Sequence, residues 1–249
     1  MPERTNKVAV TIDVESDWGG RSGESRGIET GIPYILELLE RLGIKATFFI
    51  SCPVVAANRN TICKIADSGH ELASHGLEHE NHSKLEREVL LEKIGKSKEL
   101  IEKETGTKVV GFRSPRFRVN RHLFEVLLDS GFRYDSSMVR NCEPFYIESG
   151  LLEVPVTSFF RIPFGLRYIN SIGFGASKFL MKKLPSTAIF YLHPFDVISR
   201  SAYTKLSGHY PAKIWYYFRA DRAAETLEKT LRWLKNDGKE FILIKEILK

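Results

Sequence analysis

Cysteine is scarce in this sequence and apolar runs are short. The three cysteines, Cys52, Cys63 and Cys142, are widely spaced and form no C-x-x-C pair, which argues against a disulfide framework and against a cysteine zinc site. No apolar run reaches the roughly 20 residues of a membrane-spanning helix. The first residues, Met1 to Lys7, contain no apolar segment typical of a secretory signal. We therefore expect a reducing compartment, with the cytoplasm as the location.

The charge also lacks a strong concentration of one sign. The formal net charge of +6 comes from 37 lysine and arginine residues against 31 aspartate and glutamate residues. An anionic partner such as nucleic acid, a phospholipid surface or a phosphorylated substrate could account for this excess. Lysine and arginine interleave with glutamate, however, as in segments 86–88 and 96–99, and this pattern favours solvated helix faces. No basic–aromatic strand motif or recognition helix is present, so we expect no nucleic-acid partner.

Hydrophobic periodicity predicts strands and helices in alternation. Ser83 to Glu86 has the form of a capping box that starts a long helix. The predicted strands cover residues 7–13, 46–51, 71–74, 109–113, 132–135, 151–156, 188–193 and 240–244, and the predicted helices cover 30–42, 61–67, 83–104, 120–128 and 221–235. The alternation implies an α/β fold with a parallel sheet, either open or closed into a barrel. Without a repeat or a clear linker, residues 1–249 are expected to form a single domain.

Two pairs of polar residues follow predicted strands. Asp13 and Glu15 are two residues apart at a strand end, so their carboxylates point to the same side. His75 and His79 are four apart, a spacing that places two imidazoles on one face of a helical turn for a single metal ion. Alone, the two acids could be a helix-capping residue and a surface residue, and the two histidines could both be surface residues. Together, two histidines and one carboxylate leave open positions for water and substrate, as a hydrolytic metal requires.

Two further clusters follow later strands. Arg113, in Arg113-Ser114-Pro115-Arg116, is either a surface cation beside a turn or a cation that orients a nearby carboxylate. His193 ends an apolar strand. Such a histidine is often a core residue, but it also suits a general acid, because the ordinary pKa of histidine is near neutrality.

In this order, the four clusters resemble the motifs of the polysaccharide deacetylases, the NodB-homology group or carbohydrate esterase family four. That family shows a T-F-D-D or D-x-D/E element, then H-[ST]-x-x-H, then R-x-P-x, and finally L-x-H or L-H. The corresponding segments here are residues 11–15, 75–79, 113–116 and 192–193, and Ala46-Thr47-Phe48-Phe49 and Gly69-His70-Glu71 also fit the family context. The resemblance covers about residues 8–194, and it is the ordered set of motifs that makes it specific.

The resemblance implies a distorted, incomplete (β/α) barrel and a role for each matching residue. Asp13 would be the general base, positioned by Arg113, and His193 the general acid. The remaining implied roles are metal binding by Glu15, His75 and His79, and substrate or oxyanion binding by Pro115, Arg116 and Leu192, with the backbone N–H of Arg116 facing the oxyanion. The metal would be zinc, with cobalt, nickel or manganese as alternatives.

The sequence departs from the family pattern at several positions. Glu15 is longer than the usual aspartate, Gly76 replaces the usual serine or threonine, and Arg116 replaces a common tyrosine. The family motif that supplies an aspartate partner for the general acid is not found. Asp135 and Asp196 are both candidates for that role.

The expected substrate is an acetylated amino sugar, in a glycan or linked to a lipid. Removal of formyl or another acyl group from a non-peptide amide is an alternative, and an inactive carbohydrate-binding module is a more distant one. Two aromatic and basic segments, residues 178–183 and 213–219, either pack in the core or form a peripheral membrane-surface contact for a lipid-linked sugar. The sequence does not indicate the oligomeric state.

Overall fold

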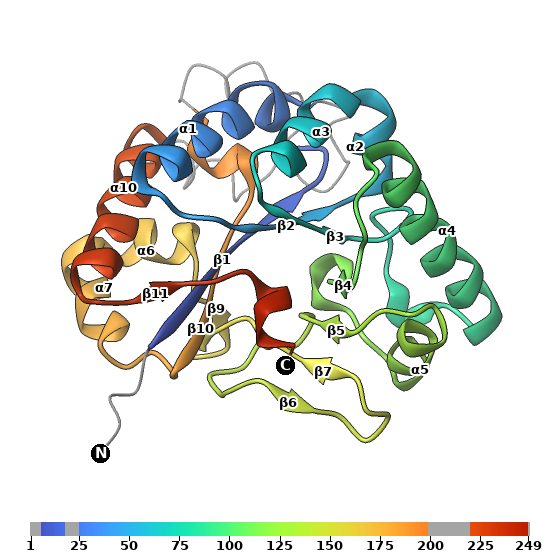
Figure 1. Cartoon of the computed structure of the whole chain (residues 1–249). Helices are drawn as coiled ribbons and strands as arrows, with labels where there is room; N and C mark the ends of the chain where they lie inside the picture. The colour runs from blue at the N-terminus through green and yellow to red at the C-terminus, as the bar shows by residue number, and fades with distance from the viewer. Residues whose placement is uncertain (1–5, 18–24, 199–219, 249) are drawn as a thin grey trace.

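The computed structural model describes residues 6–17, 25–198 and 220–248 of the 249-residue chain. A curved sheet lies at the centre, and helices cover its outer, convex side (Figure 1). In spatial order, its strands are β10 (Thr187–Leu192), β1 (Lys7–Val14), β2 (Thr47–Ile50), β3 (Glu71–Ser74), β4 (Gly111–Phe112), β5 (Tyr134–Asp135), β7 (Leu152–Glu153) and β6 (Phe145–Tyr146), with β11 (Glu240–Phe241) paired to β1. All neighbours are parallel except β6 and β7.

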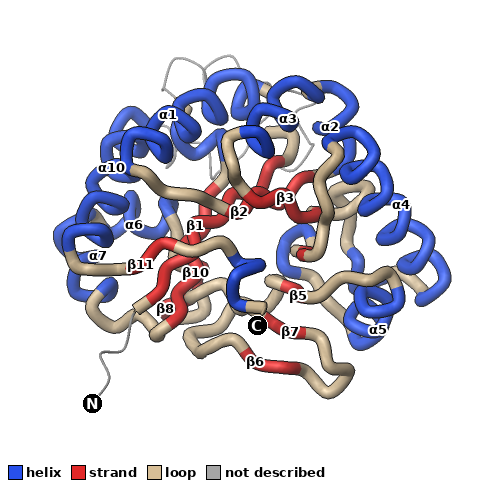
Figure 2. The backbone as a smooth tube through the Cα atoms, in the orientation of Figure 1, coloured by secondary structure: helices blue, strands red, loops and turns tan. Residues whose placement is uncertain are grey.

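The helices wrap around this sheet in the tube view as well (Figure 2). Helices and short helical turns are, in chain order, η1 (Gly27–Gly31), α1 (Ile32–Leu42), α2 (Cys52–Ala57), α3 (Arg59–Asp67), η2 (His82–Lys84), α4 (Arg87–Thr105), η3 (Pro115–Phe117), α5 (Arg121–Asp129), α6 (Leu166–Ile172), α7 (Phe174–Met181), η4 (Pro194–Val197), α10 (Ala220–Asn236) and η5 (Ile244–Ile247). No helix among the described residues is long and apolar enough to cross a membrane.

A small hairpin, β8 (Ser158–Phe159) and β9 (Ile162–Pro163), forms a separate two-stranded sheet on the segment that follows β7. Val156, just before the hairpin, pairs with Val139, and Gly165, just after it, pairs with Tyr191 of β10. The result is a distorted, incomplete (β/α) barrel, which confirms the predicted fold class.

The apolar pattern explains how the strands are buried. Strand β1 reads KVAVTIDV and is buried from Val8 to Val14, as expected for a parallel strand covered on both faces. The C-terminal segment covers the amino-terminal edge of the sheet. Two hydrogen bonds hold it there: Ile244 N–H donates to Thr47 Oγ1, and Lys245 N–H donates to Glu71 Oε2. The carboxyl ends of the strands, where all four predicted clusters lie, remain accessible for a site.

Several predicted boundaries were wrong. The proposed capping box at Ser83 to Glu86 does not form, because the Asn81 side chain accepts hydrogen bonds from both the N–H and the hydroxyl of Ser83 and stabilises the separate turn η2. Helix α4 then begins at Arg87. The strands predicted over 151–156 and 240–244 are only two residues long in each case, and helices α2, α6 and α7 were not predicted.

Candidate active site

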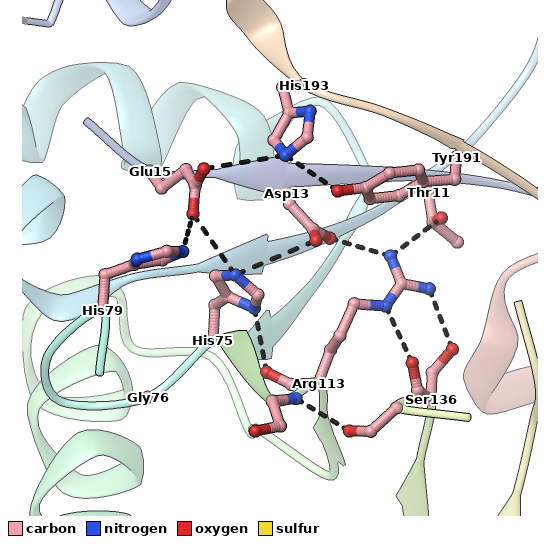
Figure 3. A network of polar contacts seen from close by, with 12 residues as sticks. Thr11, Asp13, Glu15, His75, Gly76, His79, Arg113, Ser136, Tyr191 and His193 are labelled. Atoms are coloured by element: carbon pink, nitrogen blue, oxygen red, sulfur yellow. Dashed lines mark hydrogen bonds and ion pairs between the residues drawn. The ribbon is translucent and has the colours of Figure 1, made fainter. Parts of the chain in front are cut away.

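Asp13, at the carboxyl end of β1, is buried and held by one cation. Arg113 Nη1 donates to Asp13 Oδ1 at 2.8 Å and to Thr11 Oγ1 at 3.0 Å. The other Asp13 oxygen, Oδ2, lies 3.8 Å from His75 Nε2 (Figure 3). Arg113 therefore occupies one carboxylate oxygen and leaves the second facing the histidine.

Arg113 is itself fully buried, and its orientation is determined by the neighbouring strands. Its Nε and Nη2 groups donate to the carbonyl and hydroxyl oxygens of Ser136 at 3.0 and 2.8 Å, and its guanidinium carbon lies 4.0 Å from the centre of the Phe49 ring. A planar guanidinium with this many fixed contacts has little freedom to rotate. The structure thus supports the interpretation of Arg113 as a positioning cation and not as a surface residue.

Glu15, His75 and His79 converge on one point. Glu15 Oε2 lies 2.6 Å from His79 Nε2 and 3.5 Å from His75 Nε2. The two histidines do not share a helical turn, which corrects the prediction: residues 75–81 form a loop, because Gly76 has a φ of +92° and turns the chain away from a helix. The expected convergence is present, but a loop produces it.

The donor set of this cluster fits a divalent metal. The candidate ligand atoms of Glu15, His75 and His79 all lie within 4.8 Å of one another. The Arg113 carbonyl accepts from His75 Nδ1 at 2.8 Å, which turns Nε2 towards the cluster. Glu15 Oε2 is buried and has no aligned hydrogen bond from the part of the chain that the structure describes, despite its short contact to His79. Two imidazoles and one carboxylate at a cavity are typical ligands of a hydrolytic zinc ion.

The electrostatics of the cluster also favour a bound cation. Burial opposes the charge of Glu15, but His75, His79 and His193 hold its pKa well below the ordinary value. Burial also opposes charge on His75, yet Asp13 and Glu15 outweigh it and raise the pKa of His75. Two buried carboxylates at one strand end therefore attract positive charge.

His193 lies across the cavity from the two other histidines. Its Nε2 is 3.6 Å from Glu15 Oε1 and 2.8 Å from the hydroxyl of Tyr191. Its Nδ1 is 3.5 Å from Asp196 Oδ2, an oxygen that also accepts the backbone N–H of His193 at 2.9 Å. Asp196 in turn accepts from Arg167 Nε at 2.8 Å. Of the two candidate partners, Asp196 contacts His193.

Asp135, the other candidate, lies in a separate buried pair. It stands opposite Glu153 in the β5–β7 register, and its Oδ1 accepts the Ser137 hydroxyl at 2.6 Å. Burial raises the pKa of Asp135 to about 6 and raises that of Glu153 well above its ordinary value. The two carboxyl groups therefore favour holding a shared proton.

A cavity of about 250 Å³ unites most of the predicted site. Its lining residues are Asp13, Glu15, His75, His79, Arg116, Arg167, Tyr191, His193 and Phe195. Pro115 and Leu192, predicted to contact substrate, are both buried and do not line it. Leu192 belongs to the apolar core, because alternate side chains of a strand point to opposite faces.

Sequence reasoning missed Tyr191, Arg167 and Phe195 as cavity residues. Tyr191 was detectable, since it precedes His193 by two residues in an extended segment at the end of β10 and so shares its face. Arg167 belongs to helix α6, which was not predicted. Phe195 stacks on His193 with ring centres 4.6 Å apart and was overlooked within the motif segment.

His82 is a further residue that the sequence did not single out. Its ring is fully buried, its Nδ1 lies 3.0 Å from Ser114 Oγ, and its Nε2 has no hydrogen-bond partner among the described residues. Burial, together with the charges of His75, Lys93 and His79, lowers the pKa of His82 to about 3, so its ring is neutral. A Cβ added to Gly76 would lie 2.9 Å from His82 Cε1. The His82 ring thus occupies the space beside Gly76.

The two aromatic and basic segments have different outcomes. In α7, Met181 is buried in the core, whereas Phe179 is 63% exposed and Lys178 is exposed beside it. Segment 213–219 lies outside the described residues. Membrane-surface contact therefore stays a prediction, and flotation with anionic liposomes tests it.

Comparison with known proteins points to one family. The polysaccharide deacetylase family model matches residues 2–134. A peptidoglycan deacetylase of Helicobacter pylori is 35% identical over 156 residues, which cover 57% of this chain and 52% of the relative. The chain spans about half the length of the curated relatives it matches.

Solved structures share the fold at low sequence identity. A probable polysaccharide deacetylase from Pseudomonas aeruginosa has a TM-score of 0.73 at 15% identity, covering 99% of this chain and 91% of that one. An allantoinase has a TM-score of 0.72 at 15% identity, covering 99% and 90%. A pseudoenzyme of carbohydrate esterase family four from Bacillus anthracis has a TM-score of 0.64 at 20% identity, covering 98% and 66%. Since the family model matches more than half of its residues, the chain belongs to the polysaccharide deacetylase family.

Proposed function

We propose that the protein is a metal-dependent hydrolase that removes N-acetyl groups from an amino sugar, in a glycan or linked to a lipid. The observation that carries this proposal is a single cavity lined by a His–His–carboxylate cluster, an arginine-held aspartate and a third histidine. The peptidoglycan deacetylase relative supports the reaction class.

Glu15, His75 and His79 would hold the metal, with zinc as the expected ion and cobalt, nickel or manganese as alternatives. A bound divalent ion lowers the pKa of water and polarises a carbonyl oxygen. Backbone contacts and the course of the loop position these ligand side chains. His75 follows β3 directly and is fixed by the Arg113 carbonyl, while the loop after Gly76 returns His79 to the same point.

Asp13 serves as the proton acceptor in this proposal. Arg113 occupies Oδ1, so Oδ2 is the oxygen available to a water molecule in the cavity. The backbone N–H of Arg116 donates no hydrogen bond within the described residues and lies on a cavity-lining residue, so it is the proposed donor to the oxyanion.

His193 supplies the proton to the departing amine, which leaves poorly unless protonated. Its Nε2 lies on the cavity wall, 2.8 Å from the Tyr191 hydroxyl, while the Asp196 carboxylate lies behind Nδ1. The products are acetate and the free amino sugar. Because base and acid come from different strands across one cavity, both can reach the same amide.

The test combines metal analysis with turnover. We expect acetate release from N-acetylglucosamine oligomers or peptidoglycan when zinc or cobalt is present, and we expect His75→Ala and His79→Ala to lose both bound metal and activity. Formamido sugars and cyclic ureides in the same panel distinguish a deformylase or another amide hydrolase. Activity that persists in metal-free protein, or bound metal without turnover on any amide, contradicts the proposal.

A further inference from the structure

We propose that the Arg116 side chain binds an anionic group, a phosphate or a carboxylate, on the sugar that carries the scissile N-acetyl group. This inference rests on the proposed function and names the substrate class of the same cavity. Arg116 is exposed at the cavity wall and makes no hydrogen bond or ion pair within the described part of the chain. A guanidinium with this freedom at a substrate cavity has its bidentate donors available for a ligand.

The loop that carries Arg116 is held in a strained shape. Arg116 and Phe117 both have positive φ values, 56° and 58°, which are unfavourable for residues with a Cβ. Two hydrogen bonds of Ser114 hold the loop in place: its hydroxyl donates to the Arg118 carbonyl at 2.7 Å, and its N–H donates to Ser137 Oγ at 2.8 Å.

Phe117 fixes the other side of the loop. Its ring packs edge-on against Tyr191, with ring centres 5.3 Å apart. Backbone strain that the surrounding contacts maintain is found most often at functional sites. Here those contacts place the Arg116 side chain at the cavity, while Arg118, two residues later, is exposed outside it.

The two other arginines at or beside the cavity already have carboxylate partners. Arg113 pairs with Asp13 at 2.8 Å, and Arg167 pairs with Asp196 at 2.8 Å. Glu15 faces the histidine cluster. Arg116 is therefore the lining cation without a carboxylate partner among the described residues. A neutral sugar would leave this charge without a counterion, whereas a phosphate or carboxylate beside the acetamido group would neutralise it.

The experiment compares a neutral with an anionic substrate. Steady-state rates are measured on N-acetylglucosamine oligomers, N-acetylglucosamine 1-phosphate and N-acetylmuramic acid, so that phosphate and carboxylate sources are separate arms. The variants are Arg116→Gln, which has the same backbone preference but no charge, Arg116→Lys, which keeps the charge without the planar fork, and the matched control Arg118→Gln from the same loop.

We expect the wild-type protein to have a higher kcat/KM for an anionic substrate than for a neutral one. Arg116→Gln should lower this ratio about tenfold to a hundredfold, mainly through KM, because hydrogen bonds to charged groups are stronger than those between neutral groups. Arg116→Lys should retain part of the preference, and Arg118→Gln should retain all of it. Binding of inorganic phosphate, followed by calorimetry, should weaken most in Arg116→Gln and stay unchanged in Arg118→Gln.

The outcomes separate the two proposals. If the wild-type protein deacetylates neutral sugars at least as well as anionic ones, or if Arg116→Gln leaves the ratio unchanged, the anion subsite is refuted while the deacetylase proposal stands. If no acetylated sugar in the panel is hydrolysed with metal present, the proposed function itself fails.

Discussion

Replacing Gly76 by serine, the residue type that the family motif usually has, should damage this protein. Gly76 follows His75 directly and has a φ of +92°. A Cβ at this position would lie 2.9 Å from His82 Cε1, 3.2 Å from His82 Nε2 and 3.3 Å from the Glu78 carbonyl oxygen. The left-handed backbone and the His82 ring both oppose a side chain here.

The magnitude has two parts. A residue with a Cβ in the left-handed region costs roughly 1–2 kcal/mol. Forcing a buried group into occupied space costs about 1–3 kcal/mol more, because His82 is fully buried and packed. We therefore expect Gly76→Ser to lower the free energy of unfolding by about 2–5 kcal/mol. Activity and metal content should fall as well, because the same loop carries His75 and His79.

Urea unfolding of four proteins separates the two parts. The set is the wild type, Gly76→Ser, His82→Ala and the double variant. His82→Ala removes the contact, so serine at position 76 should then cost only the backbone part, and the cycle should show a coupling free energy of about 1–3 kcal/mol. Gly43→Ser is the matched control, since Gly43 has a φ of +64° and no atom of the described residues lies within 4 Å of an added Cβ.

Two results would refute this reasoning. One is a Gly76→Ser variant that is no less stable than Gly43→Ser. The other is an equal cost of serine at position 76 with and without the His82 ring. Either result would mean that His82 does not occupy the space that the motif side chain would need.

Three other predictions concern polar side chains at the site and in the core. Arg113→Gln should cost about 3–5 kcal/mol of unfolding free energy and abolish turnover, because it leaves a buried carboxylate without its partner; unchanged urea unfolding would contradict this. Tyr191→Phe should lower kcat up to about tenfold and change its pH profile at constant metal content, because His193 loses a hydrogen bond; an unchanged kcat would count against a role for the hydroxyl. Since burial raises the pKa of Asp135 to about 6 and holds that of Glu153 well above its ordinary value, the folded state keeps protons that the unfolded chain loses near pH 4. Stability should therefore fall as pH rises from about 4 through 6, by up to roughly 1.4 kcal/mol per pH unit per proton, and Glu153→Gln should flatten that slope in urea titrations.

The sequence predicted the strand–helix alternation well, because buried parallel strands such as β1 are short apolar runs and amphipathic helices such as α10 have a clear period. It also predicted that Asp13 and His193 lie at the same edge of the sheet, because Asp13 is at the end of β1, His193 directly follows β10, and these two strands are adjacent. Both inferences depend on local patterns and on the strand-end rule, and long-range packing does not alter them.

Two features of the site could not be predicted from the sequence: the carboxylate partner of His193 and the filling of the space beside Gly76. Both depend on how side chains from distant segments pack together. Asp196 is only three residues from His193, but excluding Asp135 as the partner required knowledge of how Asp135 packs. Asp196 lies in the turn that begins at His193, where its carboxylate accepts the histidine N–H, whereas Asp135 faces Glu153 across two strands. The space beside Gly76 is likewise filled by His82, a ring from a separate turn whose position no motif indicates.

Arg113 also explains how two neighbouring carboxylates can have different roles. Asp13 and Glu15 end the same strand, and two buried negative charges so close together repel each other unless each has its own cation. Arg113 neutralises Asp13 through Oδ1 and, with its other donors on Ser136, cannot turn to reach Glu15 without losing them. Glu15 lies one residue past β1, with Oε2 close to His75 and His79 and Oε1 3.6 Å from His193. The buried arginine thus leaves Glu15 as the carboxylate that needs an external cation, which is the physical reason for proposing that Glu15 binds the metal and that Asp13 accepts the proton.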